Sequence, residues 1–129
     1  MAIYGIGAYY DEDVSGEFIA NNFVGTGWGV TDAPELHAYF KSLKVGDVVY
    51  IKAANFGADI TVKAIGIIED DEILGYAKSA LIAVGRNVKW VNTMKFVIPK
   101  PVEKNNVRSN TVYEEFNSIV QQQIISRIG

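Results

Sequence analysis

Residues 43–52 read Leu-Lys-Val-Gly-Asp-Val-Val-Tyr-Ile-Lys, a turn that leads directly into a run of β-branched and aromatic residues. Glycine followed by aspartate is typical of a turn, and the apolar run after it has the composition of a strand. After a loop at 53–58, residues 59–68 form a second β-rich run whose polar residues thin toward its end. We therefore predict two strands here and expect them to pair.

Two glycine-broken strands are predicted on the N-terminal side, at residues 2–10 and 23–30. Between them, N-cap residue types precede a short helix at 17–20. Asn21 and Asn22 should end that helix, because asparagine tolerates the left-handed conformation.

The next helix has the clearest signal in the chain. Asp32, Pro34 and Glu35 combine an N-cap residue, a first-turn proline and a capping-box acid. Apolar residues then recur at helical spacing, namely Leu36, Tyr39, Phe40 and Leu43.

The C-terminal half is less regular. We predict that the acidic cluster at 69–72 is a solvated turn, and residues 73–86 fit either strand or buried irregular chain. Strands are predicted at 88–91 and 94–98, the second ended by prolines. Thr111 and Glu114 have capping-box spacing, which predicts a C-terminal helix with one apolar stripe made of Val112, Phe116, Ile119, Val120, Ile124 and Ile128.

Length and composition bound the class of protein. A chain of 129 residues with 49% hydrophobic residues should fold as a single globular domain, residues 1–129, of the α+β class. The absence of cysteine excludes disulfides, thiolate metal sites and a thiol nucleophile. No apolar run approaches the length of a membrane span, and no targeting segment precedes the first basic residue, Lys41. We expect a cytoplasmic protein without membrane contact.

The charge is unevenly distributed along the chain. Residues 1–72 hold twelve acids and four lysines, a net charge of −8, whereas residues 73–129 carry +5. Either the protein has one acidic and one basic face, or the halves pair within the fold. The total of −3 argues against a uniformly basic nucleic-acid-coating surface.

No residue set points to catalysis. The single histidine, His37, lies beside Leu36 on an amphipathic helix, and Asp59 and Lys63 lack the further acid that a nuclease strand needs. The cluster at 69–72 is better explained by solvation than by a cation. We expect a non-enzymatic protein without a cofactor or metal.

Trp28 lies in a segment with glycines at 25, 27 and 29, whose spacing does not match a dinucleotide fingerprint. The glycines either allow the second strand to pack tightly on the first, or let a flat ligand reach both the indole ring and the backbone. Planar bases stack on aromatic rings and need a few donors for specificity. The residues that could supply such a site are Tyr9, Tyr10, Trp28, Tyr50, Lys52, Asn55 and Phe56.

The order of these elements resembles the PUA-like superfamily, and within it the EVE-like domains. The Gly-Trp strand, the Lys-x-Gly-Asp turn into a strand and the Ala-Ile-Gly strand at 64–66 carry the resemblance over residues 2–70. It implies a small mixed β-barrel with flanking helices and a C-terminal helix, and a pocket for a base, often a modified cytosine flipped out of DNA or a modified base in RNA. Trp28 would line that pocket, with Lys52, Asn55 and Phe56 from the loop after the Gly-Asp strand.

Three functions remain open from the sequence. The first is a module that recognises a modified base or a nucleotide, in DNA or RNA or free. In a nucleic-acid complex, phosphates would contact Lys78, Arg86, Lys89, Lys95 and Arg108. The second is a sponge, of viral type, that sequesters a free signalling nucleotide. The third is a homo-oligomeric assembly protein that pairs through its C-terminal helix.

Overall fold

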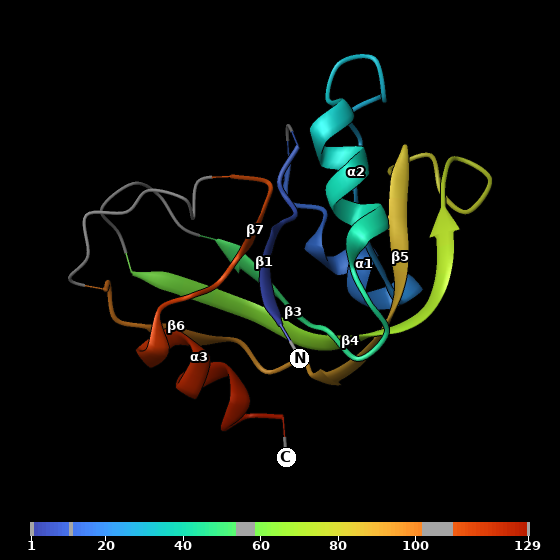
Figure 1. The fold of residues 1–129 in the computed structure, drawn as a ribbon. Helices are drawn as coiled ribbons and strands as arrows, with labels where there is room; N and C mark the ends of the chain where they lie inside the picture. The colour runs from blue at the N-terminus through green and yellow to red at the C-terminus, as the bar shows by residue number, and fades with distance from the viewer. Residues whose placement is uncertain (1, 11, 54–58, 102–109, 129) are drawn as a thin grey trace.

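A computed structural model describes residues 2–10, 12–53, 59–101 and 110–128 (Figure 1). Its strands are β1 (Ile3–Gly7), β2 (Phe23–Thr26), β3 (Val48–Ala53), β4 (Ile60–Leu74), β5 (Val84–Asn92), β6 (Phe96–Ile98) and β7 (Val112–Glu114). Its helices are α1 (Ser15–Asn21), α2 (Pro34–Ser42) and α3 (Ser118–Ile125). The mixed α+β class predicted from the sequence is confirmed.

The strands of the described residues form one open sheet in the order β2-β5-β4-β3-β1-β7, with β6 paired to β4. Only the β1–β3 pair is parallel, and the other pairs are antiparallel. The predicted pairing of the strands that follow the Gly-Asp turn is confirmed as β3 and β4. Because β1 and β3 are parallel neighbours, the segments that follow both strands leave the sheet at the same end.

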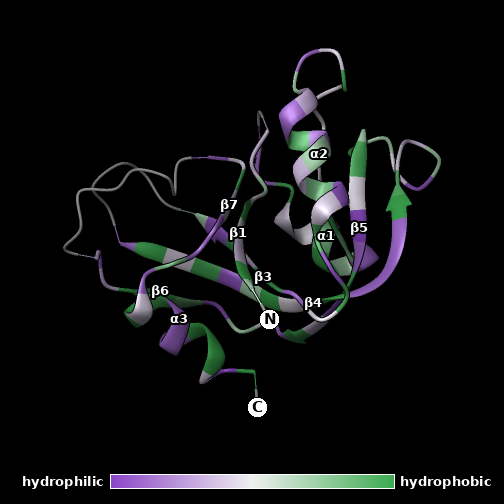
Figure 2. Cartoon of the chain, in the orientation of Figure 1, coloured by the Kyte–Doolittle hydropathy of each residue, from purple (hydrophilic) through white to green (hydrophobic). Residues whose placement is uncertain are grey.

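The sheet has a hydrophobic core on each face. Val49 and Ile51 of β3 belong to one core, and Val48 and Tyr50 belong to the other, as expected for alternating side chains. The first core is covered by α1 and α2 through Phe18 and Phe40, and the second by α3 through Val120 and Ile124. Figure 2 shows the corresponding alternation of apolar and polar residues along β4. The chain therefore has two separate layers in which a site could form.

The acidic cluster at 69–72 lies within β4 and not in a turn. β4 continues through it to Leu74, and the register against β5 shifts between Ile68 and Ile73, so the cluster forms an irregularity in a long strand. The side chain of Asn87 on β5 donates hydrogen bonds to the carboxylates of Asp70 and Glu72 at 2.8–3.2 Å. Pairing with β5 thus overrides the turn that four consecutive acids suggest.

The predicted start of the C-terminal helix is wrong. Val112–Glu114 forms β7 and pairs with β1, while the helix begins at Ser118. Its N-cap is Asn117, whose side chain accepts the backbone N–H groups of Ile119 and Val120. Of the predicted stripe, Val120 and Ile124 are buried, whereas Phe116 and Ile119 are exposed.

Smaller differences occur elsewhere in the chain. The helix predicted after Asp32 is present as α2, but its N-cap residue is Ala33 and no side chain caps it. β2 ends at Thr26, and the ambiguous segment at 73–86 contains the end of β4, a turn-rich connection and the start of β5. Asn22 does adopt the left-handed conformation at the end of α1, as predicted.

Candidate functional site

The Tyr10 side chain holds three segments together. Its ring lies beside Gly27, where an added Cβ would be 3.4 Å from the ring, and its hydroxyl donates to the carbonyl oxygen of Leu81 at 2.8 Å. The ring also meets Phe18 edge-on, at 6.4 Å between centroids. Burial raises the pKa of Tyr10 to about 12, so the phenol stays protonated as a donor. The described residues of the segments 8–10 and 12–13, 27–29 and 75–83 therefore meet around one tyrosine.

Each of these three segments carries an exposed aromatic side chain. Tyr9 is 72% exposed, Trp28 59% and Tyr76 63%. Large aromatic side chains normally bury most of their surface, so the exposure of one ring in each of three adjoining segments is unusual. We call Tyr9, Tyr10, Trp28 and Tyr76 the aromatic edge.

The main chain of Trp28 is held by hydrogen bonds, while its side chain is largely exposed. The Trp28 N–H donates to Thr26 Oγ1 at 3.3 Å, and its carbonyl oxygen lies 2.7 Å from Nε2 of His37. His37 is buried on α2. The single histidine thus contacts the aromatic edge through the Trp28 main chain.

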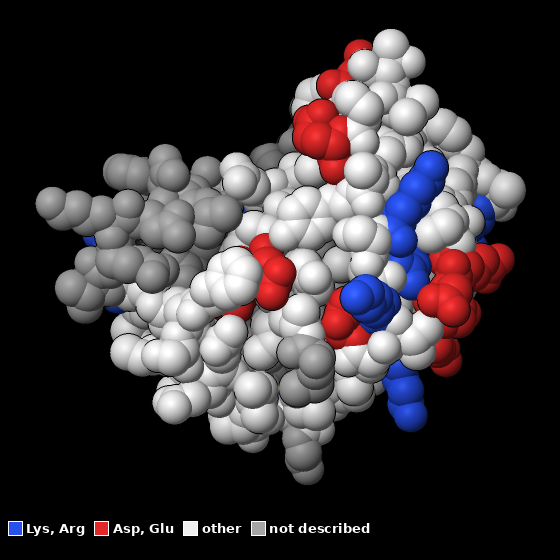
Figure 3. Space-filling model, viewed as in Figure 1, with Lys and Arg blue, Asp and Glu red and all other residues white. Residues whose placement is uncertain are grey.

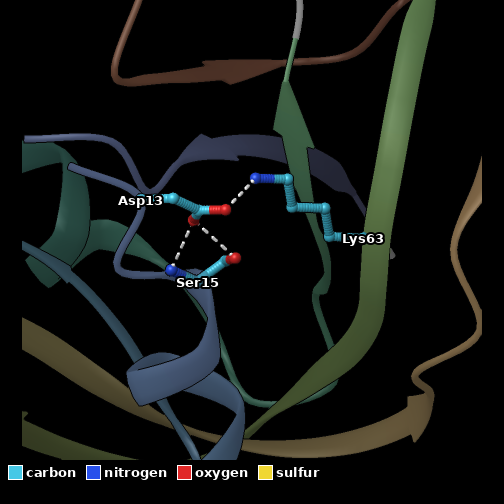
Figure 4. Close-up of polar contacts among 3 residues, drawn as sticks. All are labelled: Asp13, Ser15 and Lys63. Carbon is cyan, nitrogen blue, oxygen red and sulfur yellow. Dashed lines mark hydrogen bonds and ion pairs between the residues drawn. The ribbon is translucent and has the colours of Figure 1, made fainter.

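The segment that carries Tyr9 and Tyr10 is tied to β4 by Asp13 (Figure 4). Asp13 accepts hydrogen bonds from the backbone and hydroxyl of Ser15, at 2.9 and 2.6 Å, and forms an ion pair with Lys63 at 2.6 Å. The hydrogen bond from Lys63, assisted by those from Ser15, lowers the pKa of Asp13 to about 2. This pair lies within the acidic half of the chain, so it does not join the two halves.

The glycines around Trp28 serve different purposes. Gly25 packs against β5, where an added Cβ would overlap the carbonyl oxygen of Val84, and Gly27 gives room to Tyr10. Gly29 meets no closer neighbour than Asp32 Oδ2, at 3.9 Å from an added Cβ. Of the two alternatives for these glycines, packing of the second predicted strand against the first holds at Gly27, which lies against Tyr10, whereas β1 and β2 themselves are not neighbours in the sheet.

Tyr50 and Lys52, predicted to line the same pocket as Trp28, lie on the other face of the sheet. Tyr50 is fully buried, and its hydroxyl donates to Glu115 Oε1 at 2.6 Å and lies 2.8 Å from the Tyr113 hydroxyl. Its pKa is raised mainly by burial. Tyr50 therefore has no surface for a ligand, and its assignment to the pocket is corrected.

Lys52 is buried next to the same network. Its Nζ lies 5.7 Å from the centroid of the Tyr113 ring and 3.8 Å from the position of a Cβ on Gly7. Burial lowers the Lys52 pKa to about 8. Lys52 is not part of the aromatic edge, and Asn55 and Phe56 lie outside the described residues.

The predicted phosphate contacts do not form one patch. Arg86 is buried, and its guanidinium donates to the carbonyl oxygens of Phe40, Leu43 and Asp70, so it cannot reach a phosphate. Lys78, Lys89 and Lys95 are exposed. Lys78 lies in an aromatic-edge segment, but Lys95 follows β5 at its far end, and Arg108 lies outside the described residues.

The described part of the chain contains no group of three or more His, Asp or Glu side chains placed to hold a metal ion. None of its helices is long and apolar enough to cross a bilayer.

Sequence reasoning missed Tyr76. It lies in the segment at 73–86, which has no clear periodicity, and an isolated tyrosine in such a stretch gives no indication of exposure. The hydrogen bonds from Tyr10 to Leu81 and from the Ala83 N–H to the Thr26 carbonyl oxygen show that this segment lies beside those of Tyr9 and Trp28.

Comparison with known proteins gives the fold but no function. No protein-family model matches the chain, and no curated protein matches it in sequence. Among solved structures, the NMR structure of Rpa0253 from Rhodopseudomonas palustris is similar, with a TM-score of 0.56 and 12% sequence identity. The similarity covers 98% of this chain and 92% of that one. The chain is therefore an α+β protein with the fold of Rpa0253.

Proposed function

We propose that the chain is a non-enzymatic module that binds a base or nucleotide at the aromatic edge. The observation that carries this proposal is the position of Tyr10, which brings together three segments that each expose one aromatic ring. Base–aromatic stacking contributes about 1–3 kcal/mol per contact, and every base has a face that can stack. The Trp28 main chain is already hydrogen-bonded to Thr26 and His37, so in this proposal the aromatic rings supply the main contacts.

The resemblance of residues 2–70 to PUA-like domains supports the same kind of ligand. In this proposal Trp28 keeps the role that the resemblance implies. Lys52 does not, because it lies on the face covered by α3. The site is thus an edge at the ends of β1 and β2, and its aromatic residues come from both halves of the chain.

The distribution of basic residues favours a single base, nucleoside or nucleotide over a long strand. Lys78 is the one cation in the described part of the three aromatic-edge segments, while Lys89 and Lys95 lie elsewhere. A protein that binds a long strand by neutralising several phosphates loses affinity for that strand steeply as the salt concentration increases, and such a dependence is not expected here. A sponge for a free nucleotide would use the same rings, so the choice between it and a base reader depends on which ligand binds.

The proposal is tested by calorimetric titration with nucleosides, nucleotides and short oligonucleotides. Trp28→Ala should weaken binding at least about fivefold, because one stacking contact is lost. Phe116→Ala is the matched control: Phe116 is a 76% exposed aromatic residue outside the aromatic edge, and its loss should leave affinity unchanged. If no base-containing compound binds at millimolar concentration, or Trp28→Ala binds as well as the unmodified protein, the proposal is wrong.

A further inference from the structure

The surroundings of the aromatic edge are acidic. Residues 2–40 contain no lysine or arginine, so two of the three aromatic-edge segments contribute no positive side chain. Glu12, Asp32 and Glu35 are exposed in or next to these segments, and Asp32 Oδ2 is close to Gly29. Figure 3 shows acidic atoms over the loop that precedes α2 and over the start of that helix.

The nearby cations do not neutralise this charge. Lys63 is held by Asp13 in an ion pair, so it compensates a different carboxylate. Lys78 is exposed in the third segment and supplies one positive charge against the three exposed acids. Lys41 and Lys44 lie at and beyond the last turn of α2, at the opposite end of the helix from Glu35. The local potential is therefore negative.

We propose that the ligand of the aromatic edge is a base with a positive charge delocalised over its ring, such as an N-alkylated purine. This inference rests on the proposed function and specifies its ligand class. The faces of tryptophan and tyrosine carry negative charge density that attracts cations, with tryptophan the strongest. A cationic base therefore stacks on the aromatic faces and is also attracted to them and to the nearby carboxylates. A phosphate group attached to the base would be repelled by these carboxylates.

A pair of isomers separates charge from stacking. 1-Methyladenosine is cationic at pH 7, and N6-methyladenosine has the same atoms apart from the proton but is neutral. Calorimetric titration should show about fivefold tighter binding of 1-methyladenosine, a preference that decreases as salt screens the carboxylates. Adenosine 5′-monophosphate should bind more weakly than adenosine.

Variants locate the source of the preference. The double change Glu12→Gln and Asp32→Asn should bring the ratio of the two isomers close to one, because it removes two of the three exposed charges. Neither side chain caps α1 or α2, so the fold should persist, as checked by thermal unfolding. Glu69→Gln, an exposed acid on β4, is the control and should leave the ratio unchanged.

The outcomes distinguish this inference from the proposed function. If N6-methyladenosine binds as tightly as 1-methyladenosine, the ligand class is wrong and base binding stands. An unchanged ratio in the double variant would also overturn the role of the carboxylates. If neither isomer nor any other base-containing compound binds, the proposed function itself fails.

Discussion

Lys52 shows how a residue type and its neighbours can suggest a role that its position excludes. As a lysine at the end of a strand, before a loop with an amide and an aromatic residue, it fits a donor to a base. Its side chain instead lies on the side of Tyr50 and Tyr113, where burial lowers its pKa to about 8. Strand alternation alone places Lys52 on the same face as Tyr50, but which core covers that face depends on α3.

The buried ammonium has a measurable consequence for stability. The folded state of Lys52 loses its proton near pH 8, whereas the unfolded chain keeps it to about pH 10.5. Between these values the unfolded state binds more protons, so the free energy of unfolding rises with pH, by about 3 kcal/mol in total. Below pH 8 the full cost of burying the charge remains.

Denaturant unfolding of the protein and of Lys52→Met between pH 7 and 10.5 measures this effect. The difference in unfolding free energy between the two should move in favour of the lysine protein as pH rises, because only its amine loses the penalty. Other titrating groups affect both proteins equally and cancel. A difference that stays constant over this range would contradict the prediction.

At the scale of elements, α3 shows what local signals can and cannot determine. The Thr111–Glu114 spacing matches a capping box, but Val112 and Tyr113 also favour a strand, and β1 offers an antiparallel partner. Asn117 is an equally good N-cap residue, and the helix starts after it. A competition between two local signals was therefore decided by pairing with a strand more than 100 residues earlier in the chain.

Helix α3 has one buried face and one exposed face. Ile124 is buried in the core that contains Tyr50, while Ile119 on the same helix is 61% exposed. Ile124→Ala should lower the unfolding free energy by about 2–4 kcal/mol through lost burial and a cavity. Ile119→Ala, the matched control, should change it by less than about 0.5 kcal/mol. Equal effects of the two changes in denaturant unfolding would show that α3 is not packed in this way.

At the scale of the whole molecule, Arg86 connects elements that the sequence gives no reason to associate. Its guanidinium reaches carbonyl oxygens at the end of α2 and on β4 from its own position on β5. Helix C-terminal carbonyls lack intrahelical partners, and a cation there also interacts favourably with the helix dipole. A basic residue counted toward a phosphate-binding surface thus stabilises the interior.

Arg86→Met should lower the unfolding free energy by about 2–4 kcal/mol, because buried carbonyl oxygens lose a charged donor. Lys89→Met, an exposed residue on the same strand, should change it by no more than about 0.5 kcal/mol. Chemical denaturation of both variants makes the comparison. Similar stability of Arg86→Met and Lys89→Met would contradict the role assigned to this guanidinium.

The sequence by itself determined the α+β class, the turn at Gly46–Asp47 into β3, the pairing of β3 with β4, α2, and the left-handed end of α1. These features depend on turn chemistry, periodicity and residue propensity, which act over a few residues. It also indicated Tyr9, Tyr10 and Trp28 as aromatic candidates, although not their exposure.

Only the tertiary structure decided which candidates lie together. The burial of Arg86 and Tyr50, the separation of Lys52 from Trp28, and the addition of Tyr76 to the aromatic edge all follow from contacts between distant segments. The physical reason is that a side chain's exposure depends on the layer packed above it. In this chain that layer is supplied by α1 and α2 on one face and by α3 on the other.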